Sequence, residues 1–185
     1  DTTEVLAEIL RQGLDDVAVF GFYDPDAVAL MQAVGVGNEV TISLGARQPM
    51  AALEIQSKAL QLTGTVKLIS DGLFPATVAM SRGLTMNMGT TAVLVVGGVE
   101  IVVISRHIEP FDPGCLRSLG IEPTARRFLR LKSRIHYRVG FKPLVGAVVE
   151  CAGVGVCTSD YSQVRFENVR RPIFPLDGIN TRERF

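Results

Sequence analysis

The stretch TTAVLVVGGVEIVVIS, residues 90–105, decides how this chain folds. Two runs rich in β-branched residues flank the dipeptide Gly97-Gly98, and glycine reaches the positive φ angles that a tight two-residue turn requires. Both runs are apolar at successive positions, which is typical of strands covered on both faces. The stretch therefore predicts a β-hairpin near the centre of a sheet, with further layers packed on each side.

The sequence before this hairpin predicts a helix, a strand and a second helix. Residues 1–13 carry apolar side chains at helical spacing, and Asp1 and Glu4 have the spacing of a capping box. DVAVFGFY, residues 16–23, predicts a buried strand, and Asp24-Pro25 is the usual order of N-cap and first helical residue. Alternation in residues 40–44 then indicates a strand with one face on the core.

The remaining segments complete a mixed pattern of strands and short helices. Residues 53–70 predict two strands that meet near Thr63-Gly64, and residues 71–89 a loop with short pieces of strand. The later segments predict a short helix (112–121), a strand leading into a helix (127–139), a buried strand (146–156) and an extended tail (160–185). We expect one α+β domain over residues 1–185, with a mixed, largely antiparallel sheet, a central β-hairpin and several short helices packed on it.

Composition excludes several classes of protein. The counts of Lys+Arg and Asp+Glu are 19 each, so no overall charge favours nucleic acid or an anionic membrane surface. The sequence has no apolar run of about 18 residues that could span a bilayer, and no segment resembling a signal peptide. The cysteines Cys115, Cys151 and Cys157 lack C-x-x-C spacing, which favours buried thiols in a reducing compartment. We expect a cytoplasmic protein that binds neither nucleic acid nor membrane.

The segment KSRIHYR, residues 132–138, is the richest cluster of polar side chains. If it is helical, Lys132 and His136 share a face, which could hold an anionic group or present His136 as an acid or base. A solvated basic helix face is the more common meaning of such a pattern. The two histidines, His107 and His136, each lack a second histidine three or four residues away, so a self-contained zinc site is not expected.

Five stretches together resemble the carboxy-terminal region of the microcystinase C family, bacterial zinc metallopeptidase-like proteins also classed as peptidase family M81. The stretches span residues 1–46, 89–105, 111–123, 131–144 and 170–177, and they occur in the family's order along nearly the whole chain. Each is weakly diagnostic by itself, whereas their common order is specific.

The resemblance implies that an amino-terminal domain, absent from this chain, supplies the metal ligands. In that family a segment like D-N-P-G-G-G-x-x-G-D precedes the first helix, and Asp1 matches its final aspartate. By the same matching Asp1 has an active-site role, and Lys132, Ser133 and His136 correspond to the family's KS..H pattern. The resemblance thus implies zinc as cofactor, with His136 and Asp1 as catalytic residues and Lys132 and Ser133 as substrate-binding residues.

From this resemblance we expect the chain to be a carboxy-terminal domain that completes the active-site cleft of a zinc-dependent peptidase or amide hydrolase. Its partners are its own amino-terminal domain and a small or linearised peptide, and the isolated domain is expected to be inactive. The alternative is a noncatalytic binding or assembly lobe that docks on another domain or on a second subunit, and a homo-oligomer stays open. A thiol enzyme built on one of the cysteines is a third alternative.

Overall fold

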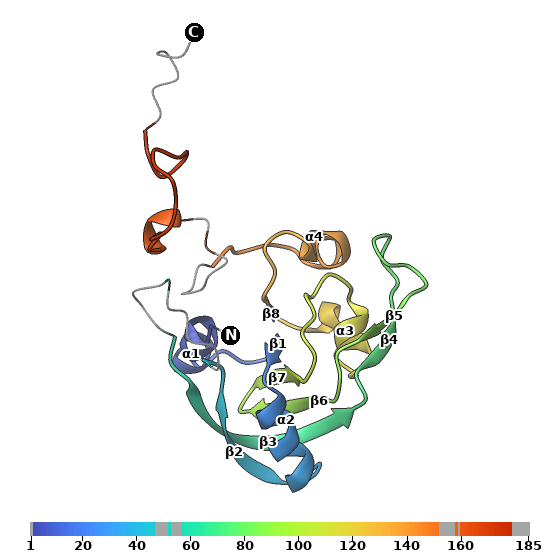
Figure 1. Ribbon diagram of the computed structural model, residues 1–185. Helices are drawn as coiled ribbons and strands as arrows, with labels where there is room; N and C mark the ends of the chain where they lie inside the picture. The colour runs from blue at the N-terminus through green and yellow to red at the C-terminus, as the bar shows by residue number, and fades with distance from the viewer. Residues whose placement is uncertain (1, 47–51, 53–56, 152–157, 159, 179–185) are drawn as a thin grey trace.

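The hairpin at Gly97-Gly98 lies at the centre of a six-stranded sheet in the order β2-β3-β6-β7-β1-β8. The computed structural model describes residues 2–46, 52, 57–151, 158 and 160–178 (Figure 1). Strands β6 (Thr91–Val96) and β7 (Val99–Ile104) form the hairpin, and Gly97 has a φ of 57°. Both strands are buried along most of their length, which confirms the predicted central hairpin.

The domain is α+β in class, and its main sheet is mostly antiparallel, as expected. The other strands of this sheet are β1 (Val17–Tyr23), β2 (Glu39–Leu44), β3 (Leu60–Ser70) and β8 (Phe128–Leu131). Pairs β2-β3, β3-β6 and β6-β7 are antiparallel, whereas β1 runs parallel to both of its neighbours, β7 and β8. The parallel part of the sheet therefore consists of β7, β1 and β8.

Two apolar cores cover the two faces of the sheet. Helices α1 (Glu4–Arg11) and α2 (Pro25–Val34) pack on one face through residues such as Leu6 and Met31, both fully buried. Asp24 caps α2, since its carboxylate accepts a hydrogen bond from the N–H of Ala27 at 3.1 Å. The first core thus forms around the predicted helix-strand-helix unit.

The second core lies on the opposite face, beneath α3 (Gly114–Arg117) and α4 (Tyr137–Gly140). A small two-stranded sheet, β4 (Leu73–Pro75) and β5 (Thr85–Asn87), adds Phe74 to it. Asp112 joins these parts, because its buried carboxylate accepts hydrogen bonds from the N–H groups of Thr77, Val78 and Gly114. Short 3-10 helices complete the described structure: η1 (Pro123–Ala125), η2 (Lys142–Leu144) and η3 (Tyr161–Gln163).

Several sequence-based predictions of local structure are wrong. β3 runs unbroken through Thr63-Gly64 as a single strand, because Gly64 lets the backbone of β6 approach closely. Residues 53–56 of that prediction lie outside the described residues. Residues 146–151 form no strand and are largely exposed, while residues 152–156 of the same prediction lie outside the described residues. The first helix begins at Glu4 with Thr3 as N-cap, so Glu4 does not hold the capping-box position that a cap at Asp1 requires.

The cysteines agree with expectation in part. Cys115 is buried as predicted, whereas Cys151 is exposed, and Cys157 lies outside the described residues. Residues 160–178 lead away from the sheet and contain a single turn of 3-10 helix (Figure 1). Residues 179–185 of the predicted extended tail are outside the described part. No helix in the described ranges has the length and apolar character needed to cross a bilayer.

Candidate functional site

The carboxyl ends of the parallel strands β7, β1 and β8 lie together at one end of the sheet, which is called the site edge below. Because β1 is parallel to both neighbours, the segments that follow these strands emerge side by side there. Residues 105–109 follow β7, Asp24 follows β1, and residues 132–136 follow β8. In open sheets with parallel strands, ligands bind outside the carboxyl ends of those strands. This edge is therefore the candidate functional site.

Glu109 connects the segments after β7 and β8. Its Oε1 accepts a hydrogen bond from the hydroxyl of Ser133, and its Oε2 lies 2.8 Å from Nδ1 of His136. The Ser133 hydroxyl oxygen also accepts a hydrogen bond of 3.1 Å from the backbone N–H of Tyr137, the first residue of α4. The carboxylate thereby fixes the position of His136 relative to the sheet.

The arrangement differs from a serine-histidine-acid triad. In a triad the imidazole lies between the hydroxyl and the carboxylate, so that it can remove the hydroxyl proton. Here the carboxylate of Glu109 lies between Ser133 and His136, and the Ser133 hydroxyl donates to that carboxylate. Among these three residues the Ser133 hydroxyl is therefore bound to the carboxylate and not to the imidazole. The expectation that Ser133 contacts substrate stays a prediction.

Glu109 is held in its charged form. Burial by itself raises the pKa of this carboxyl, but the hydrogen bonds from Ser133 and His136 outweigh burial, and the pKa lies below its ordinary value. A charged acceptor beside Nδ1 favours the tautomer in which Nδ1 carries the proton and donates to Glu109. Nε2 of His136, whose side chain is half-exposed, is then open to accept a proton or a hydrogen bond.

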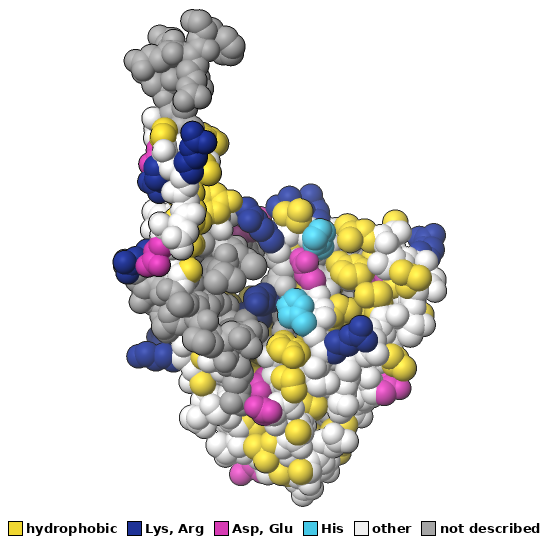
Figure 2. Space-filling model, in the orientation of Figure 1, with side chains coloured by type: hydrophobic (Ala, Val, Ile, Leu, Met, Phe, Trp, Pro, Cys, Tyr) yellow, Lys and Arg dark blue, Asp and Glu magenta, His cyan; other side chains and the backbone are white. Residues whose placement is uncertain are grey.

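Both histidines of the chain lie on the face of the molecule that Figure 2 shows, with acidic and basic side chains beside them. His107 follows β7 and contacts Tyr23, the last residue of β1, edge to face, with 6.1 Å between the ring centroids. His107 also lines a pocket together with Arg106 and with residues of β5. The site thus continues from the Glu109–His136 pair toward the small β4-β5 sheet.

Lys132 and His136 do not share a helix face, which corrects the conditional expectation. Residues 132–136 lie in an irregular segment, and α4 begins at Tyr137, so the i to i+4 relationship of a helix does not apply. Lys132 is exposed just past the end of β8. Lys132 directly follows the last residue of β8, at the candidate site. Its substrate-binding role stays a prediction.

Asp1, the other candidate catalytic residue, lies outside the described residues. The adjacent Thr2 is described, and its carbonyl accepts a hydrogen bond of 3.3 Å from the guanidinium of Arg130 on β8. Burial lowers the pKa of Arg130 to about 10, and its side chain stacks over the ring of Phe22 at 5.0 Å. Thr2 therefore lies beside the carboxyl-terminal half of β8.

The described residues do not assemble a metal site. No group of three His, Cys, Asp or Glu side chains among them is placed to hold one metal ion. Glu109 and His136 are one carboxylate and one imidazole, and they bind each other through Nδ1. A structural or catalytic zinc ion needs at least three protein ligands, so the described part of this chain does not fit zinc by itself.

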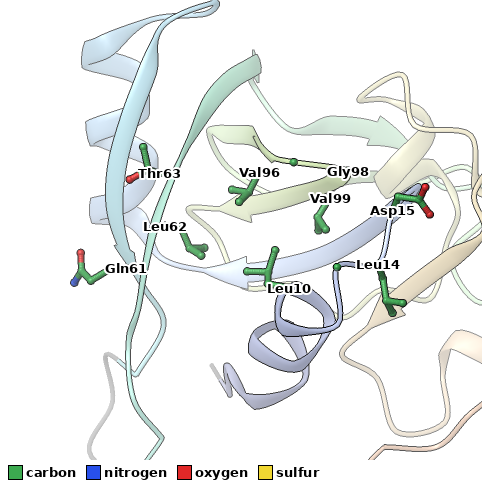
Figure 3. Close-up of a pocket in the computed structure, with 11 residues that line it drawn as sticks. Leu10, Leu14, Asp15, Gln61, Leu62, Thr63, Val96, Gly98 and Val99 are labelled. Carbon is green, nitrogen blue, oxygen red and sulfur yellow. The ribbon is translucent and has the colours of Figure 1, made fainter.

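A second hollow lies at the opposite end of β1 and β7 (Figure 3). It has a volume of about 460 Å³ and is lined mainly by the leucines Leu10, Leu14 and Leu62 and by the hairpin turn. Asp15, the charged residue of its lining, forms an ion pair with Arg127. This hollow lacks the acid-base groups that the other edge of the sheet provides.

Sequence reasoning missed Glu109. The residue lies five positions after the end of β7, in the segment SRHIEP, where only His107 was considered. The available signal was an acidic residue shortly after a predicted buried strand. The pairing of β7 with β1 could not be read from the sequence, and that pairing gives the signal its meaning.

Most of the chain matches one known protein family. Residues 1–168 match the family described as the MlrC C-terminus. The chain belongs to this family. It is 25% identical over 183 residues to Microcystinase C from Sphingomonas sp., covering 97% of this chain and 33% of that protein.

A solved structure has the same fold. The crystal structure of a candidate metallopeptidase from Mesorhizobium sp. BNC1 matches 97% of this chain with a TM-score of 0.79 and 21% sequence identity. The match covers 35% of that chain. This chain therefore spans about a third of the length of the relatives that it matches.

Proposed function

We propose that this chain is the carboxy-terminal domain of a metal-dependent peptidase or amide hydrolase, in which it forms one wall of the active-site cleft. The observation that carries the proposal is the pairing of Glu109 with His136 at the carboxyl ends of the parallel strands. Membership of the MlrC C-terminus family supports the hydrolase class, as does the fold shared with a candidate metallopeptidase.

The metal in this proposal is zinc, held by ligands from a preceding domain. The described residues hold no complete ligand set, and the relatives are about three times as long as the matched region. The substrate is a small or linearised peptide, which we infer from the class of the relatives and from an open polar edge that suits amide groups. We infer a cytoplasmic protein, and the chain's own amino-terminal domain is its main partner.

The residues of this chain would then bind, orient and exchange protons. Nε2 of His136 accepts a proton or donates one to the substrate, while the charged Glu109 stabilises the imidazolium that forms. Ser133 and the N–H of Tyr137 hold this pair in place. Lys132 offers a positive charge to the substrate, and Asp1 orients a group of the cleft from just before the first helix.

The test uses the intact protein, with the preceding domain present. Turnover of a peptide substrate is compared for the wild type, Asp1→Asn, His136→Ala and Arg117→Gln. Loss of a general acid or base costs about 10²- to 10⁴-fold, so His136→Ala is expected to reduce kcat by that order. Arg117 forms an exposed ion pair with Glu122, and its replacement serves as the control for removing a surface charge. Unchanged turnover in both Asp1→Asn and His136→Ala contradicts the site assignment.

Metal analysis separates this proposal from a noncatalytic assembly lobe. The intact protein is expected to hold zinc, and the ion is expected to remain with the preceding domain when the two parts are separated by proteolysis. Zinc retained tightly by the carboxy-terminal part contradicts the proposed division of roles. Full hydrolase activity of the preceding domain by itself indicates the assembly lobe instead.

A further inference from the structure

The pocket beside His107 has a lining rich in hydrogen-bond donors. It has a volume of about 270 Å³ and is lined by residues 85–87 of β5 and residues 106–108 of the segment after β7. Drug-sized ligands occupy pockets of about 300–1,000 Å³, so this volume suits one amino-acid side chain or terminal group. None of the lining residues is acidic.

Arg106 supplies a positive charge to this pocket. Its side chain is exposed, and within the described ranges it has no hydrogen bond or ion pair with an acidic side chain. The nearest acid along the segment, Glu109, is already bound by Ser133 and His136. The guanidinium therefore presents its donors to solvent, in a geometry that matches a carboxylate.

Asn87 adds a second donor. Its Oδ1 accepts a hydrogen bond of 2.7 Å from the N–H of Gly89, and this bond leaves its Nδ2 group to donate. Thr85 is a further lining residue that carries a hydroxyl group. A ligand that accepts several hydrogen bonds and carries negative charge complements these groups.

The walls of the pocket are tied together. The N–H of Arg106 donates to the carbonyl of Met88 at 2.8 Å, and the N–H of Ser105 donates to the carbonyl of Thr90 at 3.1 Å. The approach is close, because a Cβ at Gly89 would lie 2.4 Å from the Ser105 hydroxyl oxygen. The backbone that carries Arg106 is therefore held against the strand segment that carries Asn87, which limits the loss of entropy on binding.

We propose that this pocket binds a carboxylate of the peptide-like substrate through Arg106. The proposal rests on the proposed function and names a substrate class for the same site. Arg106 and Glu109 are three residues apart, so their Cα atoms are separated by at most about 11 Å. An extended peptide advances about 3.3 Å per residue, so a peptide of a few residues is long enough to reach from the segment of Arg106 to the segment that carries Glu109. The carboxylate comes from an Asp or Glu side chain or from the carboxyl terminus.

Direct binding is measured first, on the intact protein and without turnover. The NMR signal of the Arg106 guanidinium is followed while glutarate is added, with glutaramide as the neutral probe of equal size. Glutarate is expected to shift this signal, and glutaramide is not. Arg106→Gln is expected to weaken glutarate binding about 10- to 100-fold, the usual effect of losing a hydrogen bond to a charged group. Arg106→Lys keeps the positive charge but lacks the paired N–H donors of the guanidinium, and it should retain part of the affinity for glutarate.

Kinetics with four tetrapeptides then identify the source of the carboxylate. The peptides combine a free or amidated terminus with a glutamate or glutamine side chain. Arg106→Gln is expected to raise KM about 10- to 100-fold, with kcat little changed, for whichever peptides carry the recognised carboxylate. Sensitivity to amidation identifies the terminus, and sensitivity to glutamine identifies the side chain.

Controls keep the two proposals separate. Arg117→Gln removes an equal charge elsewhere and should leave glutarate binding unchanged, and thermal unfolding checks that Arg106→Gln folds. Absence of an Arg106 response to glutarate, or equal glutarate affinity in wild type and Arg106→Gln, overturns the carboxylate pocket. An inactive protein that still binds glutarate through Arg106 overturns the hydrolase assignment alone.

Discussion

Oε2 of Glu109 lies 2.8 Å from Nδ1 of His136, although 27 residues separate the two in the chain. The sheet makes this pairing, because β7 and β8 both run parallel to β1 and deliver their following segments to one edge. Any chemistry of His136 therefore depends on a carboxylate that belongs to a different segment.

Replacement of Glu109 by glutamine should lower kcat of the intact protein by about 10- to 100-fold, the range typical of residues that orient a reactive histidine. The glutamine side chain has nearly the same size but cannot stabilise an imidazolium by charge. The measurement is kcat/KM as a function of pH, together with ¹⁵N NMR of the His136 ring. A pH profile and a tautomer identical to the wild type contradict the positioning role.

Replacement of Ser133 by alanine should have a smaller effect, a decrease of kcat of about 10-fold or less. Its hydroxyl donates to Glu109 and accepts from the N–H of Tyr137, so we expect it to support the pair and not to act as a nucleophile. Loss of a nucleophile would cost far more, on the order of 10⁶-fold. Single-turnover assays distinguish the two cases, and a residual rate near background identifies Ser133 as a nucleophile.

Asp112→Asn should destabilise the domain by about 1.5–3 kcal/mol at pH 7. Burial alone raises the pKa of Asp112, but hydrogen bonds from the N–H groups of Val78, Gly114 and Thr77 outweigh it and lower the pKa below its ordinary value. A depressed folded-state pKa stabilises the protein above the unfolded-state pKa, and this stabilisation is lost as the pH falls below about 4.

Urea unfolding at pH 7 and at pH 3 checks that the stabilisation by Asp112 decreases as the pH falls. The free-energy difference between wild type and Asp112→Asn should be largest at pH 7 and smaller at pH 3, where the wild-type carboxyl begins to take up protons. An equal difference at both pH values contradicts the electrostatic explanation. Asp26→Asn, an exposed aspartate in the first turn of α2, is the matched control.

Gly64→Ala should destabilise the sheet by about 1–3 kcal/mol, the usual cost of overpacking. A Cβ at this position would lie 2.3 Å from the carbonyl oxygen of Val95 on β6, so one of the two strands must move. Gly146→Ala is the control, since no heavy atom lies within 4 Å of its added Cβ. Thermal unfolding of both variants tests the contact, and equal melting temperatures contradict it.

The thiol of Cys115 should resist alkylation until the domain unfolds. Burial, and then the nearby Asp112 carboxylate, raise the pKa of this thiol, and the thiolate is the form that reacts. In a chain with Cys151→Ser and Cys157→Ser, the labelling rate with iodoacetamide should follow global unfolding in urea. Fast labelling in native buffer contradicts the buried position.

Local patterns were enough to predict most elements. The glycine pair between two apolar runs specifies the hairpin because each requirement, the turn and the flanking strands, is met within residues 90–105. Asp24-Pro25 likewise specifies the start of α2, because the carboxylate of Asp24 accepts a hydrogen bond from the N–H of Ala27, three residues further along. The single long β3 could not be predicted, because Gly64 looked like a turn and serves instead as a close contact with β6.

The sequence by itself determined the α+β class, the central hairpin and the helix-strand-helix start, since these depend on composition and on local periodicity. The family resemblance was also available from the sequence, because it depends on the order of five stretches along the chain. It also identified His136 as a candidate. Only the tertiary structure decided that Glu109 is its partner and that Arg106 and Asn87 line one pocket. The physical reason is that parallel strand order brings distant segments together, and no local pattern encodes which strands become neighbours.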